Sequence, residues 1–230
     1  MYKIEEHNAF YLHEDPRCQP KEFFKFLVRL AEPQLSTGST VLDIGCASGA
    51  FLHYLRSLHS TLRLAGIDVS PQIITKAKER VPDARFSVGN IYTGDQLPTE
   101  RFDVVFMSGV NYLFSDYEVW LRNLLSVTKG SAYVYGLFNP EDLDVYSTVR
   151  RSGDKTSSTP WNLISEKSIS MFLESLNVRH KFFRWTLPIE NPRAHADPMR
   201  SWTIETKDSG MLVVNGTQTV HRFAALRMDA

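Results

Sequence analysis

Hydrophobic and polar positions along the middle of the chain follow two different periods. Short apolar runs bounded by turn residues are typical of buried strands, and apolar residues three to four positions apart are typical of helices. The runs that predict strands are Val41–Ile44, Leu62–Ser70, Ala84–Val88, Phe102–Phe106 and Ser131–Phe138. The helical pattern is found over 50–58, 71–80 and 117–127. Because strands and helices alternate, the pattern predicts an α/β fold with a mostly parallel sheet.

Further elements are expected on both sides of this core. A broad apolar face predicts a helix over 20–35, and Lys129-Gly130 is the expected end of the last core helix. After a polar loop at 139–162, the pattern predicts a helix at 165–176 and strands at 178–187 and 220–228. Apolar runs on either side of Lys207–Gly210 have the signature of a β-hairpin.

These elements predict one domain, residues 1–230. We divide it into an N-terminal arm and helix (1–35), a core (36–140) and a C-terminal segment (141–230). The arm at 1–19 is either a loosely packed lead-in or a lid over the core, with Tyr11 offering a hydroxyl.

The first strand runs into a glycine-containing turn, from Asp43 to Gly49, and a helix follows directly. Gly45 and Gly49 permit backbone conformations that a side chain hinders, and they let a ligand approach the main chain. A pyrophosphate-binding turn has a third glycine and positive potential. Here Ala47 stands between the glycines, and the Asp43 carboxylate lies at the strand end, where ligands of open α/β sheets bind. The turn therefore favours a cationic or hydrogen-bond-donating ligand over a phosphate.

A second acid, Asp68, ends the second predicted strand at the spacing of a βαβ unit. A carboxylate can accept hydrogen bonds from both hydroxyls of a ribose. The same residue can also cap the helix that begins at Pro71, sharing the cap with Ser70. The two roles are compatible, and we favour ribose binding.

Taken as a set, these residues resemble the class I S-adenosylmethionine-dependent methyltransferases. The pattern D-x-G-x-x-x-G followed by an apolar helix is similar to motif I of that family, and Phe102–Phe106 is similar to its fourth strand. The resemblance covers 36–140 and implies a Rossmann-like enzyme, a methyltransferase with S-adenosyl-L-methionine as its cofactor. It also implies a doubly wound, mostly parallel, seven-stranded sheet with an antiparallel terminal strand, here with an inserted C-terminal β-hairpin.

The resemblance also assigns roles to single residues. In that family the glycine turn wraps the amino-acid end of the cofactor, and the acid at the position of Asp43 binds its ammonium group. Asn90 stands where the adenine amino group is bound, beside the Ile91 main-chain amide, although Gly-Asn is also a common turn pair. The expected cofactor-binding residues are Tyr11, Asp43, Gly45, Cys46, Ala47, Gly49, Asp68, Val69, Asn90, Ile91 and Ser108.

The acceptor side is expected after the fourth strand. Asn111 and Tyr112 lie where the family faces the transferred methyl group and the acceptor, so we predict that they bind substrate together with His195. His195 is a candidate general base in a proline-rich loop, or simply a surface histidine. No catalytic residue is assigned.

Composition and charge exclude several classes of partner and site. The 230 residues carry 26 Lys plus Arg and 26 Asp plus Glu, so the formal net charge is zero and no broad nucleic-acid surface is expected. The two cysteines are too few for a disulfide framework or a zinc site, and Cys46 is expected to be a small buried residue. No metal site is predicted, because the acids around 141–144 fit a charged loop. The absence of a signal core or a long apolar run favours a cytoplasmic location without a membrane partner.

These observations favour methyl transfer to a small-molecule acceptor, an oxygen of a saccharide or of another metabolite. The C-terminal segment has a loose similarity to saccharide-modifying methyltransferases. Alternatives are a cofactor-binding protein of this fold without catalysis, or a methyltransferase acting on a protein or nucleic acid. A nicotinamide-dependent oxidoreductase is disfavoured by Asp43 and Ala47.

Overall fold

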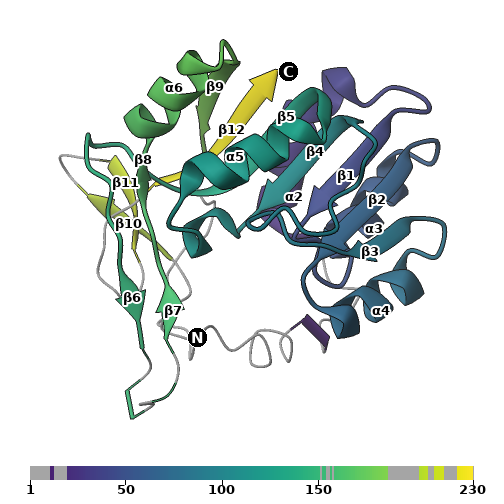
Figure 1. Cartoon of the computed structure of the whole chain (residues 1–230), viewed down its shortest axis with the longest axis horizontal. Helices are drawn as coiled ribbons and strands as arrows, with labels where there is room; N and C mark the ends of the chain where they lie inside the picture. Colours follow the sequence, from purple (N-terminus) through teal and green to yellow (C-terminus); the bar gives the residue numbers. More distant parts are fainter. Residues whose placement is uncertain are drawn as a thin grey trace.

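The structure is a computed structural model of the whole chain. It describes residues 11–12, 20–150, 152–153, 156, 158–185 and 224–229, and the main chain of 202–206, 210–214 and 222–223. Strands and helices alternate through the first part of the chain, and the predicted α/β fold with a mostly parallel sheet is confirmed (Figure 1).

The central sheet of the described residues has the strand order β3-β2-β1-β4-β5-β12-β9. These strands are β1 (Thr40–Ile44), β2 (Arg63–Asp68), β3 (Arg85–Val88), β4 (Phe102–Ser108), β5 (Thr128–Asn139), β9 (Arg179–Arg184) and β12 (Arg222–Asp229). Neighbouring strands from β3 to β5 in this order pair in parallel. In contrast, β12 is antiparallel to both β5 and β9. The two-residue β8 (Ile164–Ser165) pairs with the end of β5.

The antiparallel strand lies one place inside the edge of the sheet. The sequence explains this order, because β12 contains the buried run Ala224-Ala225-Leu226 and is covered on both faces. In contrast, β9 alternates charged residues with partly buried ones, which suits an edge strand that must not pair with other chains.

Helices cover both faces of the sheet, as a doubly wound fold requires. Val104 and Phe106 of β4 pack under α2 (Glu22–Ala31), α3 (Ala50–Leu58) and α4 (Pro71–Arg80). The alternate residues of β4, Val105 and Met107, pack under α5 (Tyr117–Ser126) and α6 (Glu166–Ser175). The described residues also contain two short 3-10 helices, η1 (Glu32–Gln34) and η2 (Asn111–Leu113).

The predicted helix starts are confirmed by their capping bonds. The Asp116 carboxylate accepts from the Glu118 and Val119 amides at the start of α5, and Ser165 caps α6. The predicted end of α5 is wrong. Lys129 and Gly130 lie inside β5, because the helix stops at Ser126 and the chain turns directly into the strand.

Most of the segment expected as a polar loop, 139–162, belongs to a two-stranded arm (residues 145–163) that projects away from the sheet (Figure 1). Its strands are β6 (Thr148–Val149) and β7 (Thr159–Pro160), and a bridge joins Val145 to Leu163 nearer the sheet. The predicted hairpin is confirmed as the antiparallel pair β10 (Trp202–Thr206) and β11 (Gly210–Val214). Within the described part of the chain, no helix has the length and apolar character needed to cross a membrane.

Candidate functional site

The segment from Asp43 to Gly49 connects β1 to α3 at the carboxyl end of the sheet. Gly45 and Gly49 have φ angles of 69° and 79°, and Ala47 has a φ of 46°. A non-glycine residue in this left-handed region is strained by about 1–2 kcal/mol. The turn therefore adopts the conformation of a glycine-rich loop although its middle position is alanine.

The main-chain amides of this turn are used inside the protein. The Gly45 and Cys46 amides both donate to the Ile67 carbonyl, at 2.9 and 3.0 Å, and the Gly49 amide donates to Cys46 at 2.9 Å. The Ala47 amide donates to the Asp68 carboxylate at 3.1 Å. A turn that binds a pyrophosphate leaves these N–H groups to the ligand. This turn offers carboxylates instead.

Asp43 is 3% exposed, and no described residue donates a hydrogen bond to its carboxylate. Burial, and secondarily the charge of Asp68, raises the pKa of Asp43 well above its usual value. A buried carboxylate without donors is costly unless it is protonated or paired with a cation. The geometry of Asp43 therefore suits the ammonium group of a ligand.

Asp68 ends β2 beside Asp43. Its carboxylate accepts from the Ala47 amide at 3.1 Å and from the Ser70 amide at 3.0 Å. Burial raises its pKa, and these backbone bonds oppose the rise. The cap of α4 is Ser70, whose hydroxyl accepts from the Ile73 amide. Asp68 thus connects the turn after β1 to the end of β2. A carboxylate has about four lone-pair sites, so Asp68 keeps acceptor capacity for a ligand.

Cys46 is 4% exposed, as expected for a small buried residue. Burial, followed by the charges of Asp43 and Asp68, raises the pKa of its thiol well above the usual value. Because the thiolate is the nucleophilic form, this thiol is unsuited to catalysis. The Cys46 sulfur also explains why residue 66 is a glycine. A Cβ at this position would lie 2.9 Å from Cys46 Sγ and 2.8 Å from the Phe86 ring.

The residues predicted to bind adenine follow β3. The Asn90 side-chain oxygen accepts from the Tyr92 amide at 2.9 Å and from the Thr93 amide at 3.4 Å, so it stabilises the turn. No described residue accepts a hydrogen bond from the Ile91 amide. Val69, directly after Asp68, is 45% exposed and offers an apolar surface at the same edge. These two residues remain the better candidates for an adenine ring.

Ser108 ends β4, in register with Tyr135 of β5. Its hydroxyl is buried and has no hydrogen-bond partner. Tyr135 is 5% exposed and stacks on Phe23 of α2, with ring centroids 4.6 Å apart. Burial raises the pKa of Tyr135 well above 10, so its hydroxyl stays protonated. Tyr135 could not be identified from the sequence, because an aromatic residue in a strand usually belongs to the core.

The three residues predicted to bind substrate, Asn111, Tyr112 and His195, do not form one cluster among the described residues. Asn111 is 4% exposed, and its amide donates to the Leu137 carbonyl at 2.9 Å, so its side chain fastens η2 to β5. Tyr112 packs on Trp161 of the arm, with ring centroids 4.4 Å apart. Tyr11, predicted to bind the cofactor and not the substrate, lies near Lys21, whose ammonium is 5.6 Å from the tyrosine ring centroid. His195 lies outside the described residues.

One side chain that sequence reasoning missed is Arg80 at the end of α4. Its guanidinium donates to the Ser48 hydroxyl at 2.8 Å, and Ser48 is 1% exposed. The contact joins α4 to the glycine turn. A lone arginine at a helix end carries no motif, so the sequence could not have identified it.

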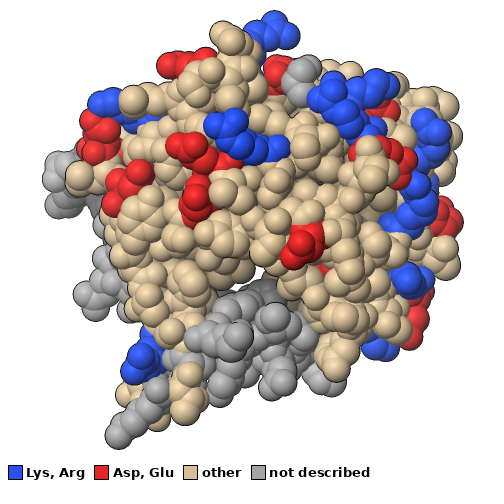
Figure 2. Space-filling view, in the orientation of Figure 1, with Lys and Arg blue, Asp and Glu red and all other residues tan. Residues whose placement is uncertain are grey.

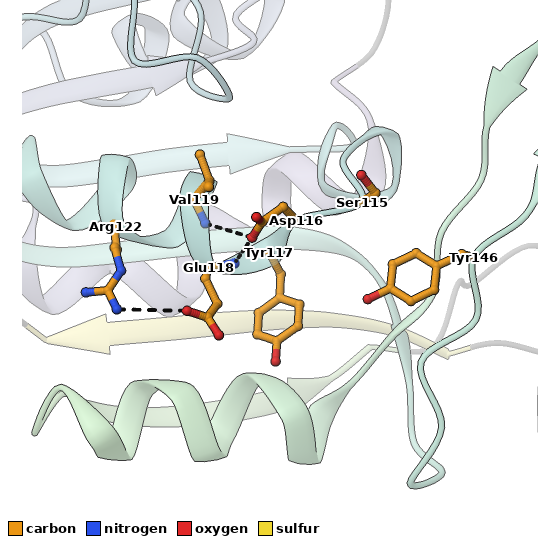
Figure 3. A pocket seen from close by; sticks show the side chains of 7 residues that line it. All are labelled: Ser115, Asp116, Tyr117, Glu118, Val119, Arg122 and Tyr146. Atoms are coloured by element: carbon orange, nitrogen blue, oxygen red, sulfur yellow. Dashed lines mark hydrogen bonds and ion pairs between the residues drawn. The ribbon is translucent and has the colours of Figure 1, made fainter.

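A cavity of about 510 Å³ lies beside the start of α5. It is lined by Ser115, Asp116, Tyr117, Glu118, Val119, Arg122 and Tyr146 (Figure 3). Tyr146 comes from the arm and its hydroxyl points toward Tyr117 (Figure 3). No residue predicted to bind the cofactor lines this cavity.

Acidic and basic side chains are interspersed over the visible face of the molecule (Figure 2), which agrees with the formal net charge of zero.

Comparison with known proteins agrees with this geometry. The family profile described as a methyltransferase domain matches residues 42–133. A trans-aconitate 2-methyltransferase from Variovorax paradoxus is 28% identical over 117 residues, which is 50% of this chain and 42% of that protein. The chain thus matches less than half the length of such curated relatives.

Solved structures share the fold at low sequence identity. YcgJ from Bacillus subtilis superposes with a TM-score of 0.60 at 14% identity, over 90% of this chain and 97% of that one. The magnesium protoporphyrin IX methyltransferase from Synechocystis PCC 6803, solved with bound S-adenosylmethionine, has a TM-score of 0.60 at 13% identity, over 99% and 91% of the two chains. The resemblance to class I S-adenosylmethionine-dependent methyltransferases is therefore confirmed at the level of the domain and the fold.

Proposed function

We propose that this chain binds S-adenosyl-L-methionine at the carboxyl ends of β1 and β2 and transfers its methyl group to a small molecule, since residues 42–133 match the profile of a methyltransferase domain. One observation carries the proposal. Asp43 is a buried carboxylate without a described hydrogen-bond donor, next to a turn whose amides are already bonded. A cationic ammonium satisfies that carboxylate, whereas a pyrophosphate would be repelled by it.

Different residues of the site bind different parts of the cofactor. Asp43 takes the ammonium group, and the free lone pairs of Asp68 take the ribose hydroxyls. The Ile91 amide and the exposed side chain of Val69 take the adenine ring. When bound, the cofactor supplies a methyl group that its sulfonium has already activated. The protein then contributes chiefly positioning and exclusion of water.

The proposed acceptor is an oxygen of a small metabolite. The neutral charge balance gives no support for a nucleic-acid substrate. The relative from Variovorax paradoxus is named for trans-aconitate, a small organic acid, which extends the candidates from saccharides to carboxylates. The acceptor approaches from the side of Ser108, η2 and the arm, because these follow β4 at the same edge of the sheet.

A methyl-transfer screen tests this proposal. Purified protein is incubated with methyl-labelled S-adenosylmethionine and with saccharides, carboxylates, phenols or amines, and label is measured in each acceptor. We expect transfer to one of the oxygen acceptors, and Asp43→Ala should abolish it. The matched control is Asp103→Asn, because Asp103 lies at the opposite end of β4, where it bonds Thr40.

The screen separates the alternatives. Binding of the cofactor without transfer to any class of acceptor would favour a non-catalytic protein of this fold. Transfer that survives Asp43→Ala at the level of the Asp103→Asn control would contradict the assignment of Asp43.

A further inference from the structure

Two neighbouring residues of the arm carry buried donors without acceptors. Trp161 and Asn162 are 7% and 3% exposed. The Trp161 Nε1 and the Asn162 Nδ2 have no hydrogen-bond partner. The orientation of the Asn162 amide is fixed, because its Oδ1 accepts from the Ser147 amide at 3.3 Å. Leaving a donor buried and unpaired costs about 1–3 kcal/mol.

Both donors lie on the acceptor side of the sheet. The Asn162 main-chain amide donates to the Tyr112 carbonyl at 2.8 Å, and the Trp161 ring packs on Tyr112. Tyr112 belongs to η2, which directly follows the end of β4. Trp161 also packs with Leu137 near the carboxyl end of β5. The pair is therefore held at the edge where a small molecule must meet the cofactor.

Two of the other unpaired buried side-chain atoms among the described residues lie against the protein's own core. The Asn111 Oδ1 faces Gly136, because a Cβ on Gly136 would lie 1.8 Å from it. Trp120, in the first turn of α5, is 1% exposed and enclosed by the apolar core under that helix. Trp161 and Asn162 differ from both, since two donors occur on adjacent residues at a functional edge.

We infer that Trp161 Nε1 and Asn162 Nδ2 donate hydrogen bonds to a carboxyl group of the acceptor and so determine its class. A carboxylate has two oxygens that accept two N–H groups at once, and such charge-assisted bonds are stronger than neutral ones. An amine acceptor would place its own N–H groups against these donors. This inference rests on the proposed function, because it names the substrate class of the same site.

Substitutions that remove one donor and keep the packing test the inference. Trp161→Phe retains a ring against Tyr112, and Asn162→Asp retains the oxygen that accepts from Ser147. Trp120→Phe is the matched control, because it removes an equally unpaired indole N–H from the core. Binding of citrate, succinate and benzoate is measured by calorimetry with and without S-adenosylhomocysteine, with butane-1,4-diol and benzyl alcohol as uncharged comparisons.

We expect at least one carboxylate to bind the wild type more tightly than its alcohol counterpart. Trp161→Phe should weaken that binding by about tenfold or more, as the loss of a charge-assisted bond implies. Asn162→Asp should weaken it at least as much, because it removes a donor and adds a negative charge that repels the carboxylate. Affinity for S-adenosylmethionine and the melting temperature without ligand should not fall in Trp161→Phe. A merely structural indole N–H would give the same carboxylate affinity in Trp161→Phe and Trp120→Phe.

Two results would overturn the inference. One is a wild type that binds none of the carboxylates in preference to the alcohols, and the other is unchanged carboxylate affinity in both arm variants. Failure of the proposed function has a different signature, namely no binding of S-adenosylmethionine by the wild type. Carboxylate binding that depends on Trp161 would still be measurable in that case, as a binding site without methyl transfer.

Discussion

At the scale of single residues, the candidate site depends on groups that are unfavourable in the ligand-free chain. Asp43 is buried next to another carboxylate, and Ala47 has a positive φ of 46°. The sequence identified both positions, because an acid and a missing glycine are visible in the motif. It gave no sign that Ala47 keeps the left-handed conformation, which follows from the bonds that fix the turn to Ile67 and Asp68.

Ala47→Gly tests whether this strain is real. Glycine adopts a positive φ without steric cost but loses more backbone entropy on folding, so the two effects partly cancel. We expect a gain of about 0.5–1 kcal/mol in the free energy of unfolding, measured by urea denaturation without ligand. A loss of stability would show that the Ala47 methyl contributes packing that exceeds the strain.

The raised pKa of Asp43 leads to a prediction about pH. Because the folded state holds this proton more tightly than the unfolded state, stability without ligand should fall as pH rises from about 3.8 toward the folded pKa. Binding of an ammonium group requires the ionised carboxylate, so cofactor affinity should rise over the same range. Calorimetry in phosphate and Tris buffers should show proton release by the wild type and less release by Asp43→Asn.

At the scale of elements, the sequence predicted the strands and helices of the core because their apolar periods are clear. It failed where two elements meet. Lys129-Gly130 has the appearance of a helix end, yet Gly130 lies in β5 where the strand crowds β4. The role of Gly136, which leaves room for the Asn111 side chain, depends on a contact between residues far apart in sequence.

Gly130→Ala should therefore be strongly destabilising. A Cβ at this position would lie 2.4 Å from the Asp103 carbonyl oxygen, and a backbone atom cannot move aside cheaply. We expect a loss of about 2–4 kcal/mol by urea denaturation, in the range of overpacked core positions. Lys129→Ala, at the exposed neighbouring position, is the control. Equal stability of the two variants would mean that β5 shifts to accommodate the methyl group.

At the scale of the whole molecule, the fold, the antiparallel last strand and the inserted hairpin were predictable, because they follow from the order of elements. The order of the last two strands is explained by burial, since β12 is apolar on both faces and β9 is not. The arm of residues 145–163 was not predictable. Its polar sequence resembles a surface loop, and only the structure brings Trp161 against η2.

At the candidate site, we infer that the Asp43 carboxylate at the end of β1 selects S-adenosylmethionine over a dinucleotide, whereas Asp68 can bind the ribose of either ligand. Calorimetric titration of the purified chain with each ligand tests it most directly. We expect saturable binding of S-adenosylmethionine, no detectable binding of NAD, and at least tenfold weaker S-adenosylmethionine binding by Asp43→Asn. Binding of NAD, or wild-type affinity for S-adenosylmethionine in Asp43→Asn, would contradict it.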